Sequence, residues 1–326
     1  MIFKCCEWAL SHLVINADDL TYCCASFDKQ LKFLENYHGE LVDVEKYIED
    51  RKQFIERCKR EDFPDVCRDC PTLEERDWDE TPGFIDVNVS NRTKCSCDCI
   101  YCIISGGGQS EIKRDLNTKQ TYDVKPMLQH FKDKNMFKKG CHFIIGGGEC
   151  AEYPEGELKW LVDFVFSIGG SIEFLSAGIT YSKDIENALR NGESKLKVSV
   201  DAGTKPVYEQ VKRVNGYDAV WKNLKNYIKA EKKNKNKNSQ VTIKYIIIPG
   251  LNDNETETKE FIKRCNKVKC SSIEVNVEFF WMNENYDKPI SENLKKTLLF
   301  FKSQPNVFFS SNINSHVKKW LDTNLQ

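Results

Sequence analysis

The chain has 326 residues, enough for one large domain and a small one. Lysine and arginine number 48 against 49 aspartates and glutamates, so the net charge is -1 and gives no general affinity for nucleic acid. No apolar run approaches the roughly 20 residues that span a bilayer, and Glu7 and His12 interrupt any signal-peptide core. We therefore expect a cytoplasmic protein that does not enter a membrane.

Cysteine is the unusual residue of this composition, with 15 copies. Seven lie within the first 70 residues, four lie between residues 95 and 102, and four are scattered. Disulfides are rare in a reducing compartment, where clustered cysteines more often bind metal. Both clusters are therefore candidate metal-binding regions.

The N-terminal segment, residues 1–82, is rich in cysteine and poor in periodic patterns. One helix is predicted, roughly at Val42–Arg60, and a stretch rich in Pro, Asp, Glu and Trp leads to a boundary near Pro82 and Gly83. We expect a small domain that depends on metal for its folding.

From Phe84 onward, strand and helix patterns alternate. Apolar runs predict strands at Phe84–Val89, His142–Ile145, Ile172–Ser176, Leu196–Val200, Val241–Ile248 and Ser272–Phe280. Helical spacing is found at Leu158–Ile168, Lys183–Asn191, Ala219–Ala230 and Thr256–Cys265. Repeated units of this kind predict a parallel sheet and an α/β fold, either a partial barrel or an open doubly wound sheet.

Four cysteines fall within eight residues after the first of these strands, and Cys95, Cys99 and Cys102 have C-x3-C-x2-C spacing. Thiolates favour iron–sulfur clusters and zinc. A four-iron cluster held by three thiolates leaves one iron open to S-adenosylmethionine (SAM), whose reductive cleavage gives a 5'-deoxyadenosyl radical that removes hydrogen from carbon. Zinc sites usually pair two C-x2-C knuckles across a longer loop, so the spacing suits zinc less well.

These residues resemble the radical SAM superfamily, over roughly residues 83–285. Tyr101 stands before the last cysteine, where relatives stack an aromatic side chain near adenine, and Gly146–Glu149 resembles the Gly-Gly-Glu motif that holds the SAM amino group. The resemblance implies a partial (β/α)6 barrel with a helical C-terminal extension over residues 83–326. The SAM contacts that it implies are Tyr101, Gly147, Gly148, Glu149, Ser176 and Ser199.

Two cysteines depart from the family pattern. Cys97 is an extra thiol inside the motif and is expected to be a bystander. Cys150 follows the Gly-Gly-Glu motif, where many relatives have proline. A cysteine beside the radical can donate a hydrogen atom, as in some epimerising relatives, although a lone cysteine at a strand end is more often simply packed.

Four N-terminal cysteines, Cys5, Cys23, Cys67 and Cys70, have C-x17-C and C-x2-C spacing. Four thiolates could close a zinc site or a second 4Fe-4S cluster. The pattern resembles the auxiliary-cluster domains called SPASM and twitch, which in most relatives follow the barrel. That resemblance implies a second 4Fe-4S cluster that accepts or relays electrons, while the roles of Cys6, Cys24 and Cys58 stay open.

Together these features predict a radical SAM oxidoreductase that uses SAM, two 4Fe-4S clusters and a flavodoxin- or ferredoxin-type electron donor. Oxidation or epimerisation of a carbohydrate-like small molecule is expected, because cluster cysteines begin at residue 5 and no separate peptide-leader-binding domain fits. Peptide or protein modification is the alternative.

A non-enzymatic Fe–S or zinc protein is the alternative of another class. It would bind nucleic acid through the Lys-rich residues 229–240. A solvated loop joining a helix to the next strand is the simpler interpretation of that stretch. Radical methyl transfer would need a methyl carrier, for which no dedicated domain is found.

Overall fold

The computed structural model describes residues 2–23, 31–68, 70, 72–102, 122–278, 289–310 and 315–324. Contacts divide the chain into two compact units. Unit 1 comprises Met1–Thr93, Thr118–Gly148 and Pro154–Glu173, and unit 2 comprises Lys94–Asn117, Glu149–Tyr153 and Phe174–Gln326.

Unit 1 contains a mixed sheet with the strand order β7-β6-β2-β3-β4. β2 (His12–Ile15) and β7 (Phe137–Ile145) both run parallel to β6 (Phe84–Val89), while β3 (Asp19–Thr21) and β4 (Lys32–Glu35) continue the sheet in antiparallel fashion. Strands of the N-terminal segment therefore extend the sheet that begins the predicted barrel. Strand pairing does not show whether residues 1–82 fold independently. The domain boundary between residues 82 and 83 therefore stays a prediction.

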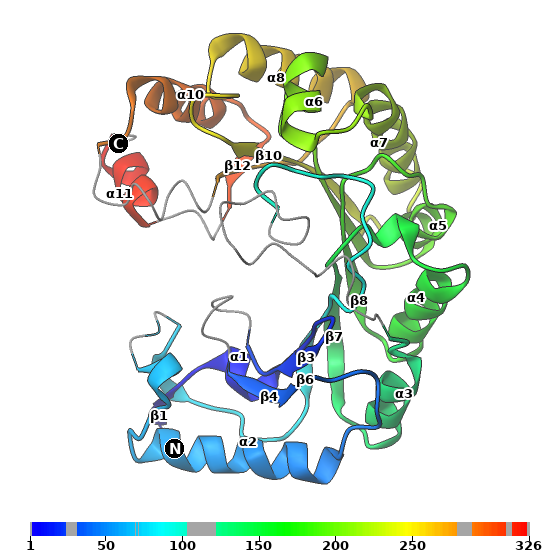
Figure 1. Cartoon of the computed structure of the whole chain (residues 1–326), viewed down its shortest axis with the longest axis vertical. Helices are drawn as coiled ribbons and strands as arrows, with labels where there is room; N and C mark the ends of the chain where they lie inside the picture. Colours follow the sequence, from blue (N-terminus) through cyan, green and yellow to red (C-terminus); the bar gives the residue numbers. More distant parts are fainter. Residues whose placement is uncertain are drawn as a thin grey trace. The chain divides into compact units, whose positions relative to one another are not determined.

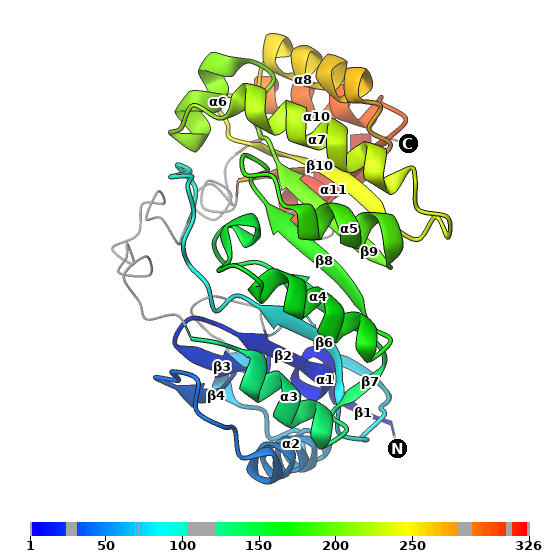
Figure 2. The same ribbon diagram turned by 90° about the vertical axis from the view of Figure 1, so that its right-hand side faces the viewer.

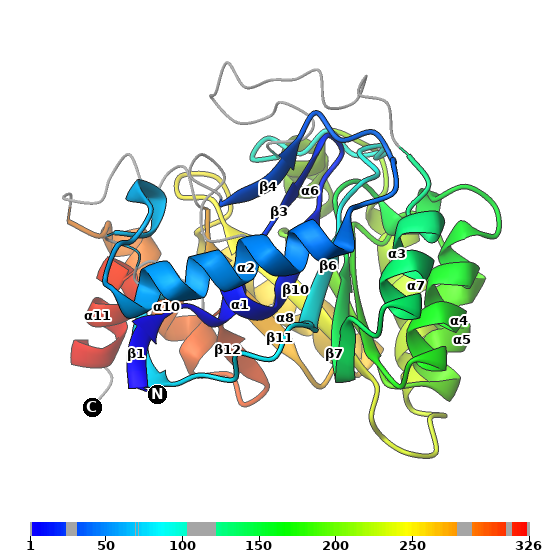
Figure 3. The ribbon, with the colours of Figure 1, turned by 90° about the horizontal axis from the view of Figure 1, so that it is seen from below.

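The long helix α2 (Val44–Lys59) confirms the helix predicted at Val42–Arg60. The Asp43 side chain begins it by accepting a hydrogen bond from the Lys46 backbone N–H at 2.9 Å. Its buried residues recur at helical spacing as far as Cys58, and Figures 1 and 3 show α2 running along its neighbours in unit 1. Those neighbours are β1 (Ile2–Cys5) and α1 (Glu7–Ser11); η1 (Asp65–Cys67) follows α2, and β5 (Glu74–Asp77) pairs with β1.

Two further helices of unit 1, α3 (Lys125–Asp133) and α4 (Glu157–Ser167), are held by aromatic contacts with the sheet. The Phe131 ring on α3 lies 5.0 Å from that of Phe84, and the Phe164 ring on α4 lies 6.2 Å from that of Phe143. All four side chains are buried, so these contacts form part of the core of unit 1.

Unit 2 contains strands in the order β8-β9-β10-β11-β12, and β9 to β12 run parallel. The strands are β8 (Ser171–Ser176), which the unit boundary crosses, β9 (Ser194–Ser199), β10 (Gln240–Ile247), β11 (Ile273–Val277) and β12 (Val307–Phe309). The fold is therefore mixed α/β with a mostly parallel sheet, as predicted. Closure into a partial barrel stays a prediction.

Two helices of unit 2 pack against its sheet. On β10, Val241, Ile243, Tyr245 and Ile247 are fully buried, whereas the alternate residue Lys244 is only half-buried. Figure 2 shows α5 (Lys183–Asn191) and α7 (Tyr217–Glu231) side by side on these strands. The other helices are η3 (Cys150–Glu152), α6 (Lys205–Lys212), α8 (Glu255–Val268), α10 (Glu292–Lys302) and α11 (Ser315–Asn324).

The Lys-rich stretch is a connection between α7 and β10, as predicted. Within it, the Asn234 side chain donates hydrogen bonds to the carbonyls of Leu189 at 3.0 Å and Gly192 at 2.9 Å. Because Asn234 is buried and bonded in this way, the connection is anchored to the end of α5.

Candidate functional site

The central loop, Lys94–Cys102, follows β6 and carries four thiols. The thiol of Cys97 lies between those of Cys95 and Cys99, and hydrogen bonding with it lowers the pKa of Cys95 and lowers that of Cys99 to about 6. The same hydrogen bonds raise the pKa of Cys97. Metal ligands must be thiolates, so the lowered pKa values suit Cys95 and Cys99 to that task.

Backbone hydrogen bonds hold the central loop against the end of α6. The Asp98 N–H donates to the Lys212 carbonyl at 3.1 Å, and the Ile100 N–H donates to the Val211 carbonyl at 3.0 Å. The Cys102 N–H donates to the Cys99 carbonyl at 3.0 Å. The loop is therefore fixed in shape by its own chain and by the last turn of a helix.

A buried network lies against this loop. The Tyr101 hydroxyl donates to Asp201 Oδ2 at 2.5 Å, and Lys212 Nζ donates to that same oxygen at 2.5 Å and to the Tyr101 oxygen at 2.7 Å. Asp201 is 0 % and Lys212 1 % exposed. The Tyr101 ring, predicted to lie near adenine, is thus fixed through its hydroxyl to two charged side chains.

The glycine turn after β7 has a shape that requires glycine. The Gly146 N–H donates to the Val89 carbonyl at 2.9 Å. Gly147 has a φ of +87°, and a Cβ there would lie 2.5 Å from the Arg92 carbonyl oxygen. A backbone that lacks side chains at this point can approach a ligand closely, which fits the predicted role in holding the SAM amino group.

Glu149 and Ser176, two of the predicted contacts, are brought together in unit 2. Ser176 Oγ donates to Glu149 Oε1 at 2.7 Å, and the Ala177 N–H donates to Glu149 Oε2 at 2.7 Å. Glu149 is 2 % exposed, and burial raises the pKa of its carboxyl. This carboxylate is held in one orientation, as a group that receives a ligand amine should be.

The two remaining candidates in unit 2 differ in environment. Ser199, the last residue of β9, is half-buried and pairs in register with Lys244 of β10. The Cys150 thiol is fully buried and donates to the Leu175 carbonyl at 3.3 Å. Its contacts are those of a packed thiol, and hydrogen donation by Cys150 stays a prediction.

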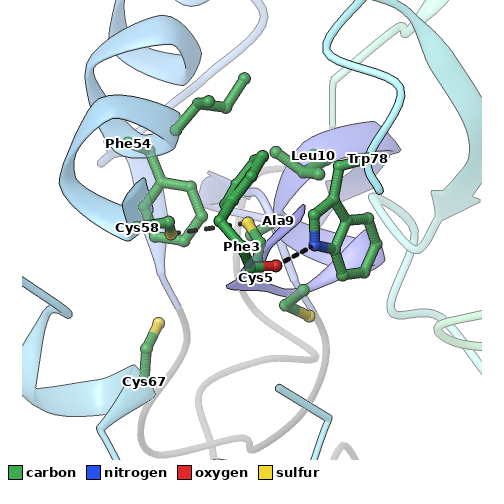
Figure 4. Close-up of a cluster of buried hydrophobic side chains, with 10 residues drawn as sticks. Phe3, Cys5, Ala9, Leu10, Phe54, Cys58, Cys67 and Trp78 are labelled. Carbon is green, nitrogen blue, oxygen red and sulfur yellow. Dashed lines mark hydrogen bonds between the residues drawn. The ribbon is translucent and has the colours of Figure 1, made fainter. Parts of the chain in front are cut away.

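Six cysteines of unit 1, here called the N-terminal thiols, come from separate elements: Cys5, Cys6, Cys23, Cys58, Cys67 and Cys70. Figure 4 shows Cys5, Cys58 and Cys67 beside Phe3, Phe54 and Trp78. The thiols of Cys5 and Cys58 lie 3.5 Å apart, and the Thr72 hydroxyl lies 3.2 Å from Cys6 Sγ and 3.0 Å from Cys70 Sγ. Cys24 lies outside the described residues.

Two of the predicted N-terminal ligands have contrasting surroundings. Burial, together with the nearby thiols of Cys23 and Cys70, raises the pKa of Cys67 to about 12. The Cys23 thiol instead accepts a hydrogen bond from the Leu31 N–H at 3.4 Å. Over the described part of the chain, no three Cys, His, Asp or Glu side chains are already gathered as metal ligands, so both ligand sets rest on donor chemistry and spacing.

Three residues of interest carried no assigned role in the sequence. Asp201 lies in a segment that resembles the family, but the pattern gives no reason to bury its charge. Lys212 looks like an ordinary last residue of an amphipathic helix. Cys58 has no C-x2-C partner, and only the packing of α2 brings it to Cys5. Each of these roles depends on contacts between residues distant in sequence.

Comparison with known families matches the chain to the radical SAM superfamily over residues 92–262. That span is more than half of the 326-residue chain and begins just before the central loop. No protein with curated function matches the sequence. Among the described residues, no helix has both the length and the apolar character that crossing a bilayer requires.

Several solved structures are similar to this chain. Streptococcus suis SuiB bound to precursor peptide SuiA is 11 % identical, with a TM-score of 0.52, over 90 % of this chain and 60 % of that one. A radical SAM methyltransferase from Sphaerobacter thermophilus is 15 % identical, with a TM-score of 0.44, over 67 % of this chain and 64 % of that one. The chain thus spans less than two thirds of the length of either protein, and the likeness to SuiB is one of fold.

Proposed function

Because the chain belongs to the radical SAM superfamily, we propose that it cleaves SAM reductively at a 4Fe-4S cluster held by Cys95, Cys99 and Cys102. The observation that carries this proposal is the central loop, whose C-x3-C-x2-C cysteines lie in the matched span and whose backbone is held by hydrogen bonds to the end of α6. When bound, the cluster and SAM supply a 5'-deoxyadenosyl radical able to abstract hydrogen from a substrate carbon.

The chain's own residues would bind and orient SAM. Gly147 and Gly148 would present their backbone to SAM in a turn that needs glycine, because a side chain at Gly147 would strike the Arg92 carbonyl. Glu149 is oriented by Ser176 and the Ala177 N–H to accept from the SAM amino group. Tyr101 presents a ring whose hydroxyl is already bonded, so the ring is held for stacking rather than free to turn.

We further propose a second 4Fe-4S cluster in unit 1, with Cys5, Cys23, Cys67 and Cys70 as ligands. Its support is that Cys5, Cys6, Cys58 and Cys67 share one buried cluster and that Cys23 and Cys70 lie near Cys67. Such a cluster would take an electron from a substrate radical, which makes the reaction a net oxidation. A flavodoxin- or ferredoxin-type donor would supply the electron for SAM cleavage.

Peptide or protein substrates are the class that we now favour. Support comes from SuiB, a protein of similar fold over 90 % of this chain that was solved with its precursor peptide. No comparison supports the carbohydrate-like substrate expected from the sequence, and none contradicts it. The matched superfamily likewise favours an enzyme over a non-enzymatic nucleic-acid-binding protein.

Anaerobic reconstitution tests the core of this proposal. The wild-type chain should bind about eight irons, reduce with dithionite and release 5'-deoxyadenosine from SAM. The triple variant Cys95→Ala/Cys99→Ala/Cys102→Ala should keep about four irons and release none. A colourless wild-type protein that holds zinc and does not react with dithionite would refute the proposal. If only the triple variant holds zinc in place of iron, the second 4Fe-4S cluster is refuted and the first is not.

The substrate class needs its own experiment. Reconstituted protein is incubated with SAM and with peptides or sugars encoded or made by neighbouring genes. A substrate should raise 5'-deoxyadenosine release. Deuterium should also pass from a labelled substrate to the nucleoside, or from a labelled nucleoside to the substrate. A response to sugars alone would overturn the preference for peptides while leaving SAM cleavage intact.

A further inference from the structure

The pair Lys212 and Asp201 is the most deeply buried ion pair in the described structure that the proposed chemistry does not use. Their side chains are 1 % and 0 % exposed, with Nζ and Oδ2 2.5 Å apart. Removing two charges from water is costly and is repaid only by excellent geometry and further hydrogen bonds. A pair retained at such a cost beside the central loop needs an explanation.

Asp201 is fixed from the sheet side. Its Oδ1 accepts from the Ile246 N–H of β10 at 2.7 Å, and its backbone carbonyl accepts from the Asn252 side chain at 2.8 Å. Its φ is +60°, a conformation that aspartate tolerates better than most residues. These contacts fix the position of the Asp201 carboxylate independently of Lys212.

Lys212 is fixed from the loop side. Its carbonyl accepts from the Asp98 N–H at 3.1 Å, and its ammonium donates to the Tyr101 oxygen at 2.7 Å and lies 5.2 Å from the centre of that ring. Tyr101 lies between Cys99 and Cys102 in the chain. The ammonium is thus one hydrogen bond from the segment that joins two predicted cluster ligands.

The two charges are placed unequally beside the loop. The Asp201 carboxylate accepts from the Ile246 N–H, the Tyr101 hydroxyl and Lys212, which together disperse its charge, whereas the Lys212 ammonium donates directly to the Tyr101 oxygen of the loop. The pair therefore presents its positive end to the loop. In a low-dielectric interior such a field is strong, and charge near an iron–sulfur cluster changes its reduction potential.

We propose that Lys212 and Asp201 are positioning residues that hold the central loop through Tyr101 and set the reduction potential of the cluster bound there. This inference rests on the proposed function, because it needs the cluster in place. The ammonium stabilises the more negative, reduced cluster and so raises its potential, while the carboxylate opposes it. A purely structural role would lower the stability of both variants without moving the potential.

The test measures the midpoint potential of the cluster in reconstituted protein by a redox titration followed by electron paramagnetic resonance. The signal that changes on adding SAM identifies the cluster of the central loop. Lys212→Met should shift its potential to more negative values, and Asp201→Asn should shift it to more positive values. The control, Arg213→Gln, removes a half-exposed pair with Asp98 in the same loop and should leave the potential unchanged.

Each outcome is decisive. A wild-type protein that binds no cluster refutes the proposed function itself. A wild-type protein that binds one, with both single variants shifting alike or not at all, refutes this inference alone. If a single variant fails to fold by circular dichroism, the double variant Lys212→Gln/Asp201→Asn removes both charges, and its potential should be more negative than that of wild type. An unchanged potential in the double variant overturns the inference.

Discussion

The central loop and the N-terminal thiols are both rich in cysteine but are built differently. In the central loop, neighbours in the chain hydrogen-bond to one another, and a buried ammonium is close at hand, so the pKa of Cys99 falls to about 6. The N-terminal thiols come from β1, α2, η1 and the segments that flank them, and burial raises the pKa of Cys67 to about 12. Thiols of a local motif can shift one another's pKa directly. Dispersed thiols become metal ligands only when the fold or the metal gathers them.

Loss of any ligand in the central loop should give the largest effect. We expect Cys95→Ala, Cys99→Ala or Cys102→Ala to abolish 5'-deoxyadenosine formation, because each removes one of three anchors. Liquid chromatography measures the amount of 5'-deoxyadenosine formed. The control Cys97→Ala should still cleave SAM; if it does not while Cys99→Ala does, the ligand assignment in the loop is wrong.

Thiol alkylation should separate the two regions by reactivity. Cys99 and Cys67 are similarly buried, 9 % and 7 % exposed, so the difference in pKa should determine their relative rates of alkylation. In metal-free protein that keeps its fold by circular dichroism, Cys99 should be mainly thiolate at pH 7 and should react with iodoacetamide about 100-fold faster than Cys67, after allowing for the lower nucleophilicity of a low-pKa thiolate. Peptide mass spectrometry reports both rates.

The pH dependence of labelling follows from the same values. Labelling of Cys99 should rise as pH passes about 6 and then level off, while that of Cys67 should keep rising toward pH 12. Cys97→Ala removes the hydrogen bond that lowers the pKa of Cys99 and should move its profile to higher pH. Equal rates at the two sites would contradict the contrast between the regions.

Loss of N-terminal thiols should halve the iron content of the protein. Replacing both Cys67 and Cys70 with Ala should reduce about eight irons to about four, leave SAM cleavage partly intact and block product formation. Iron analysis and nucleoside release are measured on the same sample. Full iron content in this variant would exclude Cys67 and Cys70 as cluster ligands, and normal product formation would exclude an electron-accepting role.

Cys58 should give the smallest effect. Its contact with Cys5 is that of a packed, hydrogen-bonded thiol, so Cys58→Ala should cost about 2 kcal/mol in urea unfolding of the reconstituted protein and leave its metal content unchanged. Cys265→Ala, at a fully buried cysteine of unit 2, is the matched control. Metal loss in the Cys58 variant alone would place Cys58 in the ligand set.

Much of the fold could be predicted because its elements carry strong local patterns. The helix predicted at Val42–Arg60 agrees with α2 to within two residues at its start. The first half of β7 was missed because residues 137–141 contain two lysines and a glycine without alternation. The three-residue β12 is too short for a period to be detected.

For the site, spacing in the sequence predicted the donor residues but not their surroundings. The meeting of Glu149 with Ser176 follows from both standing at strand ends, which the order of strands makes foreseeable. The burial of Lys212 does not follow from any local pattern, because its partners Tyr101 and Asp201 lie 111 and 11 positions away. Only the assembled fold reveals them.

The attachment of the central loop to the last turn of α6 constrains the length of the chain as well as its chemistry. Each residue added to a helix rotates the remainder of that helix by about 100°. One insertion within Lys205–Lys212 would therefore swing the ammonium away from Tyr101 and break the backbone pairing with Asp98. In related chains, the number of residues between the aspartate and the lysine should stay fixed while the identities of exposed residues drift. The exposed residues 235–238, between the buried Asn234 and Ser239, make no such contact and are where insertions should accumulate.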